Sequence, residues 1–378
     1  MNRPAQALYD VVVLGAGPAG AACALALARA GVERVRLIDG PSPAGGAVGE
    51  TLPPDTRLLL DRLGLWTAFV AEGHLPCLGS CSSWGAAALG FNDFLLSPHG
   101  GGWHLDRGRF DAFLRHHAAA AGVETSQGLR LVDAGPDPSG GFALRLRAAG
   151  GETPVVRARF VVDATGRASA FAKRLGARRR ELDRLTFIYG YFAAGNAASP
   201  SRLTLLEAVA QGWWYAAALP GQRLAVALAA DADHVRDQGL GRDARWLGAA
   251  LATRHLAPRL DGCRYLAGGL TPRVASSFIL DRVAGPRWLA IGDAAAAFDP
   301  LAAQGLYKAL ADGLDAAACL GQALDGGDER FGDYAAGIQA RFDAYLVGRN
   351  HFYGLERRWP GSAFWTRRQA RLDLATAA

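Results

Sequence analysis

Apolar and polar positions near the start of the chain fall into blocks that predict a strand, a helix and a second strand. Residues 10–14 form an apolar, β-branched run that is typical of a buried strand. Residues 21–30 are rich in alanine and predict a helix, and residues 35–38 predict another strand. We therefore expect an α/β core that begins with a β–α–β unit.

Glycines lie at the junction of the first strand and the helix, and an acidic residue follows the second strand. This junction reads G-x-G-x-x-G, which allows a tight turn, a close approach to a pyrophosphate and close packing of helix on strand. The helix N-terminus supplies free N–H groups for the phosphates, and the acid accepts ribose hydroxyls. The predicted dinucleotide-binding residues are Gly15, Gly17, Pro18, Ala19, Gly20 and Asp39.

Two later segments repeat the pattern of a strand followed by a turn of small residues. Residues 160–163 predict a strand that leads to Thr165 and Gly166, a turn suited to the adenosine side of the site. Residues 287–291 predict a strand that leads to Gly292 and Asp293. A carboxylate at that place can accept a ribityl or ribose hydroxyl. The helix that continues from Leu306 opens with small residues, whose N–H groups can face an anionic ring edge.

The middle of the chain predicts a separate layer of β-strands that carries an aromatic cluster. Short β-rich runs cover residues 185–194, 201–209, 213–219 and 223–230, and a helix-like stretch follows at residues 244–256. Side chains alternate along a strand, so Trp213 and Tyr215 share one face and Trp214 takes the other. We expect Trp213, Trp214 and Tyr215 to form a substrate pocket, with packing inside the sheet as the alternative.

The end of the chain predicts helices, with aromatic residues spaced three or four apart from Phe331 to Tyr345. Arginines and aromatic residues alternate between Arg349 and Arg371. This stretch is either a docking surface for an acidic partner or a terminal helix that packs its aromatic side chains on the core.

Composition narrows the class of protein. The 378 residues are 50% hydrophobic and 20% charged, which excludes a disordered chain. The net charge is +6, but only two of the 41 basic residues are lysines, so the excess reflects arginine-rich composition and predicts no nucleic-acid partner.

The longest apolar stretches are too short to span a membrane, and the first residues lack a secretion signal, so we expect a cytoplasmic protein with no membrane partner. The five cysteines are not spaced along the chain as the ligands of a metal site are, so we expect buried thiols and no metal site.

The three glycine motifs, in this order and at these separations, resemble FAD-dependent oxidoreductases with a glutathione reductase-type fold. Three further stretches narrow the resemblance: the run from Gly49 to Pro54, the run from Trp103 to Asp111, and the run from Gly212 to Tyr215 with Pro220. They resemble the tryptophan halogenase-like flavoproteins that include LodB-like and QhpG-like maturation monooxygenases. The resemblance extends from about residue 10 to about residue 368.

The resemblance implies an α/β fold with a Rossmann-like FAD-binding domain, an inserted mixed or antiparallel β-sheet substrate domain and a helical C-terminal tail. The FAD-binding domain is assigned residues 1–75, 100–176 and 281–325, the substrate domain residues 76–99 and 177–280, and the C-terminal segment residues 326–378. The FAD-binding residues that it adds are Glu50, Thr51, Arg107, Pro300, Gln304, Gly305 and Leu306. For Arg107 the alternative is an ion pair with Asp106 or Asp111.

The implied activity is hydroxylation of an electron-rich aromatic ring through a flavin C4a-hydroperoxide. The ring is that of a tryptophan side chain in a peptide or protein partner in the maturation monooxygenases of this group. His104 and Glu50 are the candidate acid/base residues, although His104 could instead bond a backbone carbonyl and Glu50 could cap a helix near Pro54. Electrons come from NAD(P)H directly or from a separate flavin reductase.

Two differences between this sequence and the pattern of the halogenases argue against halogenation. Halogenases of this group need a lysine near the substrate, and the chain has no lysine between Gly40 and Ala172. They also place Glu-Ser after an Asp-Pro-Leu motif, where this chain has Ala302 and Ala303. The remaining alternatives are an FAD-dependent reductase of the geranylgeranyl reductase type and a flavin-binding accessory protein without turnover.

Overall fold

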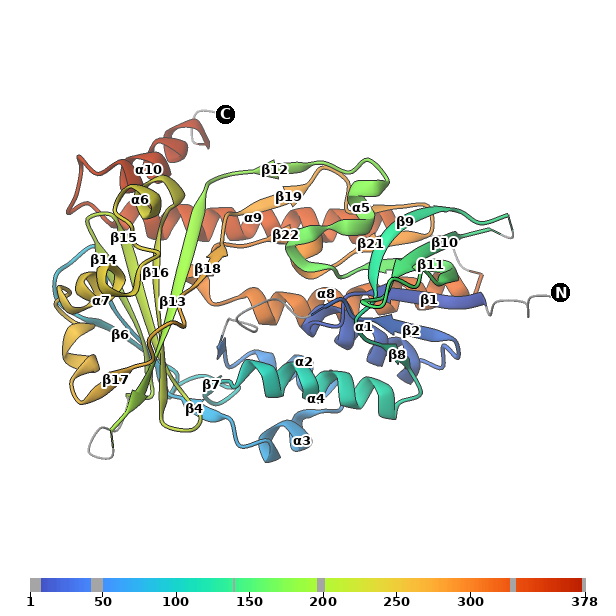
Figure 1. The fold of residues 1–378 in the computed structure, drawn as a ribbon, viewed down its shortest axis with the longest axis horizontal. Coiled ribbons are helices and arrows are strands. Elements are labelled where there is room, and N and C mark those ends of the chain that lie inside the picture. Colours follow the sequence, from blue (N-terminus) through green and yellow to red (C-terminus); the bar gives the residue numbers. More distant parts are fainter. Residues whose placement is uncertain (1–7, 42–49, 139, 196–200, 327–330, 376–378) are drawn as a thin grey trace.

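The protein is represented by a computed structural model, which describes residues 8–41, 50–138, 140–195, 201–326 and 331–375. Two large sheets lie toward opposite ends of the molecule, and long helices run between them (Figure 1). Gly49, which opens one of the motifs noted above, lies outside the described residues.

The first sheet is mainly parallel and contains the β–α–β unit that the sequence predicts. Its strands are β1 (Leu8–Leu14), β2 (Val35–Ile38), β8 (Glu124–Ser126), β9 (Arg130–Pro136), β10 (Phe142–Arg147), β11 (Val155–Asp163), β20 (Ala284–Gly285) and β21 (Trp288–Ala290). The order is β20-β21-β11-β1-β2-β8, and β10 and β9 extend it from β11 as antiparallel strands. β1 lies between β11 and β2, and the valines at positions 11–13 have no exposed surface, as a central parallel strand requires.

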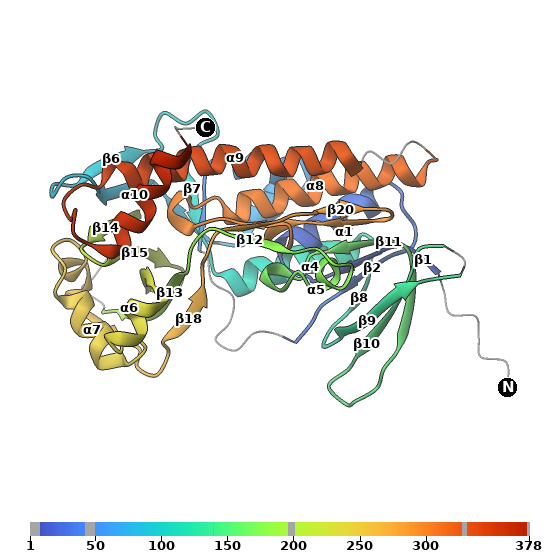
Figure 2. The ribbon, with the colours of Figure 1, turned by 90° about the horizontal axis from the view of Figure 1, so that it is seen from above.

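Long helices pack against this sheet and against each other. They are α1 (Pro18–Arg29), α4 (Arg107–Ala120), α8 (Gly305–Leu324) and α9 (Phe331–Leu355). α1 and α8 approach so closely that a Cβ on Gly313 would lie 2.6 Å from the carbonyl oxygen of Ala19. α8 and α9 run side by side (Figure 2). Within the described ranges, no helix combines the length and apolar character that a bilayer crossing needs.

The second sheet is the β-layer predicted for the middle of the chain. Its strands are β5 (Gly79–Ser83), β6 (Gly90–Asp93), β13 (Leu185–Ala194), β14 (Leu203–Val209), β15 (Gly212–Leu219), β16 (Arg223–Asp231), β17 (Cys263–Tyr265) and β18 (Thr271–Val274). The order is β17-β13-β16-β15-β14-β5-β6, with β18 paired to β13; neighbours are antiparallel except for the parallel pair β14 and β5. Strands β13 to β16 confirm the four predicted β-runs.

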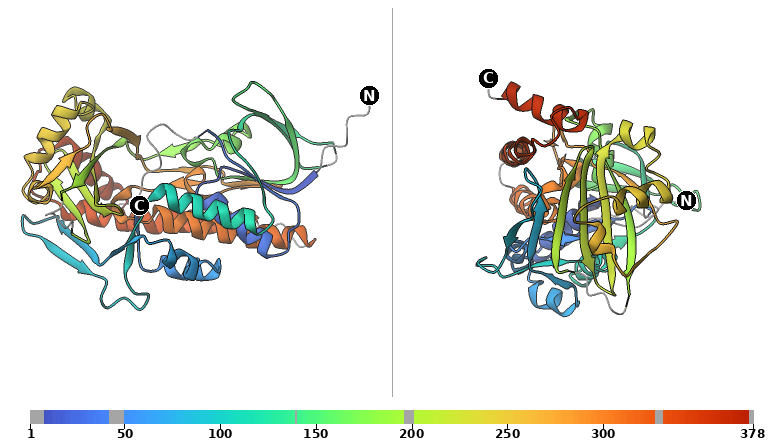
Figure 3. Two further views of the ribbon diagram at one scale, coloured as in Figure 1. Left: turned by 60° about the horizontal axis from the view of Figure 1, so that its bottom comes forward. Right: turned by 90° about the vertical axis from the view of Figure 1, so that its left-hand side faces the viewer.

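The outer face of the second sheet is covered by α7 (Asp243–Leu251) (Figure 3). The sequence predicts a helix that continues to residue 256, and this is wrong. The backbone N–H groups of Arg254, His255 and Leu256 donate instead to the carboxylate of Glu207. A buried acid therefore ends the helix by binding the N–H groups that would have continued it.

Two three-stranded sheets and several short helices complete the fold. The small sheets are β3-β7-β4, from β3 (Thr51–Leu52), β7 (Gly102–His104) and β4 (Leu75–Cys77), and β12-β19-β22, from β12 (Arg179–Glu181), β19 (Phe278–Leu280) and β22 (Ala296–Ala297). The short helices are α2 (Thr56–Arg62), α3 (Trp66–Ala71), α5 (Ala170–Arg174) and α6 (Ala232–Asp237), and the 3₁₀ turns are η1 (Gly166–Ala168), η2 (Ala257–Leu260), η3 (Gly292–Ala294) and η4 (Pro300–Ala302). The division into domains given above stays a prediction.

The C-terminal segment is helical, as predicted, and consists of α9 and α10 (Ala363–Ala375). Several of its arginines and aromatic residues are buried, whereas Arg357, Arg367 and Phe352 are exposed. Arg349 and Arg368 are buried and pair with Asp183 and Asp231, each at 2.8 Å. Phe364 and Trp365 are also buried, among side chains of the second sheet. The structure thus supports packing on the core as the role of these residues.

His104 on β7 is a buried polar residue at the boundary between the layers. It has no exposed surface, and its ring Nε2 lies 2.9 Å from Oγ1 of Thr204. Burial, with a smaller contribution from the charge of Arg259, lowers the pKa of His104 to about 4. The imidazole is therefore neutral at neutral pH.

We predict that acid destabilises the fold through His104. The pKa falls from 6.5 in the unfolded chain to about 4 in the folded one, so stability is lost as the pH drops through this window, by up to about 3 kcal/mol. His104→Gln should reduce this acid dependence, whereas the same change at the exposed His351 should not. Urea unfolding at several pH values measures the effect. An unchanged pH slope in His104→Gln would contradict it.

Candidate functional site

The turn between β1 and α1 has the shape of a phosphate cradle. Gly15 has a φ of +107°, and a Cβ there would lie 2.1 Å from the carbonyl oxygen of Ala164. A Cβ on Gly20 would lie 1.9 Å from the carbonyl oxygen of Gly15. Gly17 has no atom within 4 Å of its Cβ position, and no side chain caps the helix that starts at Pro18. The first N–H groups of α1 can therefore receive a pyrophosphate.

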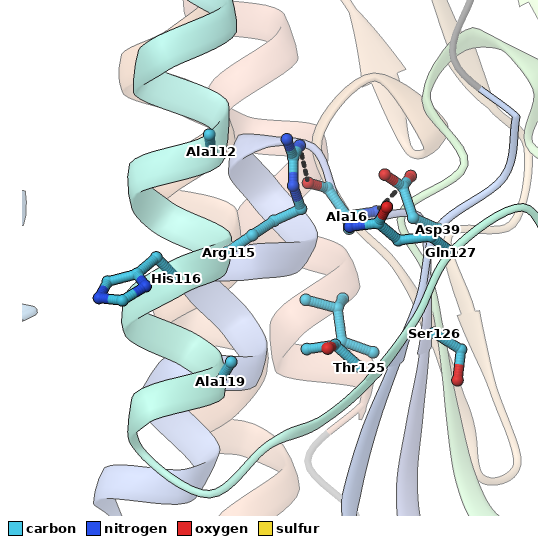
Figure 4. Close-up of a pocket in the computed structure, with 10 residues that line it drawn as sticks. Ala16, Asp39, Ala112, Arg115, His116, Ala119, Thr125, Ser126 and Gln127 are labelled. Atoms are coloured by element: carbon cyan, nitrogen blue, oxygen red, sulfur yellow. Dashed lines mark hydrogen bonds between the residues drawn. The ribbon is translucent and has the colours of Figure 1, made fainter.

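A pocket of about 270 Å³ lies beside this turn, at the end of β2 (Figure 4). Asp39 lines it, and its Oδ1 accepts the backbone N–H of Ala16 at 3.4 Å. Arg115 of α4 donates to the carbonyl oxygen of Ala16 at 3.5 Å. The second carboxylate oxygen of Asp39 has the chemistry to accept ribose hydroxyls, so the pocket suits an adenosine group.

The turn after β11 is organised by Asp163, which has no exposed surface. Its carboxylate accepts both the backbone N–H and the hydroxyl of Thr165, and the backbone N–H groups of Phe171 and Ala172. Thr165 thus supports the turn from within, and it lines neither the pocket at Asp39 nor the larger cavity described below. Gly166, with a φ of +59°, lines the larger cavity described below.

The turn after β21 is held by a buried ion pair on α8. Lys308 Nζ lies 2.6 Å from Asp312 Oδ2 and donates to the carbonyl oxygen of Gly292 at 2.9 Å. Asp312 accepts the N–H of Gly292 at 3.0 Å. Both backbone groups of Gly292 are therefore fixed, and the next residue, Asp293, lines the larger cavity.

A short loop joins this region to α8. Asp299 caps the N-terminus of the 3₁₀ turn η4, and its side chain accepts the N–H of Leu301. No side chain caps α8, which starts at Gly305. Pro300, Gly305 and Leu306 line the larger cavity, whereas Gln304 is exposed and outside its lining.

The larger cavity has a volume of about 390 Å³ and is lined from both large sheets. One side consists of the glycine turns and the start of α8. The other side consists of β13, β15 and β18 of the second sheet. The residues of the first side that reach it include Gly17, Pro18, Ala19, Gly166, Asp293, Pro300, Gly305 and Leu306.

Aromatic residues form the wall on the side of the second sheet. Phe187, Tyr189, Trp213 and Tyr215 line the cavity, and Phe187 packs edge-on against Trp213 with ring centroids 5.0 Å apart. Trp214 faces the opposite side of the sheet, where it packs against Trp246 of α7. The structure therefore brings Trp213 and Tyr215 to the cavity and does not bring Trp214.

Glu50, Thr51 and Arg107 also line the cavity. Glu50 is buried, and Thr51 Oγ1 lies 2.9 Å from the hydroxyl of Tyr215. Burial, and next to it the charge of Glu50, raises the pKa of Tyr189 and Tyr215 well above the usual value. Both phenols are therefore protonated at neutral pH.

Arg107 was predicted either to approach FAD or to form an ion pair with a neighbouring acid, and its position is compatible with both. It forms a bidentate ion pair with Asp111, with Nε–Oδ1 and Nη2–Oδ2 distances of 3.1 and 3.2 Å. It also lines the cavity. The other acid/base candidate, His104, does not line the cavity; its ring contacts Thr204 behind the wall.

Several residues of the lining are not among those predicted from the sequence. Phe187 and Tyr189 are two residues apart on β13, so their side chains share the face of the strand that lines the cavity. The alternation of side chains along residues 185–194 predicts that these two residues share a face. Arg167, Arg273 and Phe298 also line the cavity. These positions come from separate turns and strands, and no local sequence pattern marks them.

The described residues fit FAD. The glycine cradle has room at Gly17 for a pyrophosphate, the pocket at Asp39 suits the adenosine, and Asp293 faces a cavity that extends from the cradle. Open N–H groups at the start of α8 suit the anionic edge of a reduced flavin ring.

Comparisons with known proteins agree with this fit. The profile of the FAD binding domain family matches residues 8–226, more than half of the chain. LodB of Marinomonas mediterranea, provisionally named an FAD-dependent oxidoreductase, is 26% identical over 363 residues, which cover 96% of this chain and 97% of LodB. A tryptophan 2-halogenase of Chondromyces crocatus is 26% identical over 377 residues, which cover 95% of this chain and 70% of the halogenase.

One protein whose solved structure has a similar fold acts on a peptide. Peptidyl tryptophan dihydroxylase QhpG, described as essential for tryptophylquinone cofactor biogenesis, superposes with a TM-score of 0.77 at 27% identity, covering 96% of this chain and 79% of QhpG. These similarities confirm the fold class and the resemblance to tryptophan halogenase-like flavoproteins. The chain belongs to the FAD binding domain family and is an FAD-dependent oxidoreductase.

Proposed function

We propose that the protein is an FAD-dependent monooxygenase that hydroxylates an electron-rich aromatic ring, with a tryptophan side chain of a peptide or protein as the substrate. One observation carries the proposal: an aromatic wall and the cofactor turns line the same cavity. The wall offers offset or edge packing to an indole ring.

FAD would be held by residues of all three glycine motifs. The α1 N-terminus beyond Gly17 receives the pyrophosphate, Asp39 the ribose and Asp293 the ribityl chain. Pro300, Gly305 and Leu306, which line the same cavity, would hold the flavin ring. Reduced FAD supplies the activation of dioxygen and the transfer of one oxygen atom. The protein residues orient the substrate and exclude water.

Two observations support a substrate that is part of a peptide. Val274 lines the cavity and is 65% exposed, so this wall reaches the protein surface. QhpG, which is similar over most of this chain, acts on a peptidyl tryptophan. An aromatic side chain can thus enter the cavity while its own backbone stays outside.

Glu50 is the proposed acid/base residue. It is buried, lines the cavity together with the protonated phenols of Tyr189 and Tyr215, and can accept the proton that the ring releases on hydroxylation. His104 has a structural role in this proposal, because it does not line the cavity and because its pKa, lowered to about 4 by burial, makes it a weak base. The electron source is NAD(P)H or a separate flavin reductase.

Halogenation is disfavoured although halogenases are among the relatives. Ala302 and Ala303 stand where the halogenase pattern has Glu-Ser, and neither alanine has acid/base chemistry. The chain also lacks a lysine between residues 40 and 172. The reductase alternative differs in its product, which would carry no oxygen.

We predict that the protein with FAD inserts one atom of isotopically labelled dioxygen into a tryptophan-containing peptide. The reaction mixture contains NADH, a flavin reductase and bromide, and the peptide is analysed by mass spectrometry. A labelled, non-brominated product supports the proposal. A brominated product identifies a halogenase. Consumption of electrons without a labelled product from peptide or free tryptophan overturns the proposal.

Glu50→Gln should lower kcat about 100-fold or more, because a general base contributes on that scale, with a smaller change in KM. Glu152→Gln, at an exposed position, is the matched control and should retain wild-type kcat. Retained FAD absorbance in Glu50→Gln shows that cofactor binding is intact. A kcat equal to that of the control would remove Glu50 from the proposed mechanism.

A further inference from the structure

A chain of hydrogen bonds connects the aromatic wall to the loop before α8 through one tyrosine of α9. Trp213 Nε1 donates to the hydroxyl oxygen of Tyr353 at 3.1 Å. The hydroxyl of Tyr353 donates to Asp299 Oδ2 at 2.7 Å. Trp213 and Asp299 both line the cavity, and Tyr353 lies behind them, outside the lining. One buried residue therefore contacts both sides of the candidate site.

The surroundings of Tyr353 keep its hydroxyl protonated. Tyr353 has no exposed surface, and the guanidinium groups of Arg349 and Arg368 lie 4.9 and 5.4 Å from the centroid of its ring. Burial, followed by the charge of Asp299, raises the pKa of Tyr353 well above its usual value. The phenol thus remains a donor to a carboxylate, which is among the stronger kinds of hydrogen bond.

α9 also holds the Asp299 loop at two further points. The N–H of Asp299 donates to the hydroxyl of Tyr345 at 2.8 Å. Arg349 Nε lies 3.7 Å from Asp299 Oδ2, while its Nη2 pairs with Asp183 at 2.8 Å. The position of the loop relative to Trp213 is therefore set by side chains of α9, which lie far from both in the sequence.

We propose that Tyr353 is a positioning residue that fixes the distance between the aromatic wall and the cofactor loop, so that the two sides of the site are energetically coupled. Tyr353 acts through Trp213 and Asp299 and touches neither substrate nor FAD. The inference rests on the proposed function, in which the wall receives the substrate ring. It also gives a role to Tyr353, one of the C-terminal aromatic residues for which the sequence allowed either docking of a partner or packing on the core.

The test compares Tyr353→Phe with Tyr334→Phe. Tyr334 is buried on the same helix and donates one hydrogen bond, to the carbonyl oxygen of Ala290 at 2.8 Å, but Ala290, unlike Trp213 and Asp299, does not line the cavity. The dissociation constant of FAD is measured by titrating FAD-free protein, and the visible spectrum of the bound flavin and the Tm of the FAD-free protein are recorded. Tyr353→Phe should weaken FAD binding about tenfold or more and shift the spectrum. Tyr334→Phe should stay within about twofold of wild type, with a comparable loss of Tm.

A double-mutant cycle tests the coupling. Trp213→Phe should weaken FAD binding more in the wild-type background than in the Tyr353→Phe background, where the chain is already broken. Equal effects in both backgrounds, or a Tyr353→Phe variant that matches Tyr334→Phe, would overturn the proposal. If Tyr353→Phe does not fold, Trp213→Phe and Asp299→Asn form the cycle, and non-additive effects are again expected. These readouts need no substrate, so a failed oxygen-insertion assay leaves them interpretable.

Discussion

The backbone of the first turn lies against the backbone of the turn after β11, and there is no space for a side chain between them. A Cβ on Gly15 would lie 2.1 Å from the carbonyl oxygen of Ala164. This contact brings the ends of β1 and β11 together, and β21 pairs with β11 so that its own turn is adjacent. Three motifs separated by more than a hundred residues each thus form one surface. Any side chain in place of the hydrogen of Gly15 would force these turns apart and remove the cradle.

Buried charges hold the outer parts of the site in place. Lys308 and Asp312 fix the turn at Gly292, and Arg349 links Asp183 to the Asp299 loop. Such pairs are costly to bury, and removing one partner usually destabilises a protein by about 3–5 kcal/mol because a charge is left uncompensated. Their geometry therefore makes the loops that line the cavity rigid, as orientation of a cofactor and a substrate requires.

The sequence could predict those features that depend on neighbours along the chain. The glycine turns, Asp39, Asp293 and the strands from residue 185 to residue 231 follow from local spacing and alternation, and the alternation also separates Trp213 from Trp214. Contacts between segments that are distant in the sequence leave no pattern of spacing or alternation from which they could be predicted. The link from Tyr353 to Trp213 and Asp299, the helix end set by Glu207, and Arg273 at the cavity depend on the tertiary arrangement alone.

The route of α9 across both sheets affects the order in which the protein can mature. The glycine turns and the β-layer are synthesised first, but Trp213 and Asp299 gain their shared partner only when residue 353 has left the ribosome. Until then Trp213 and Asp299 lack the hydrogen bonds that Tyr353 makes with them. Stable binding of the cofactor is therefore expected only after translation of this helix. A chain truncated before α9 is expected to be an incompletely folded intermediate and not a smaller active enzyme.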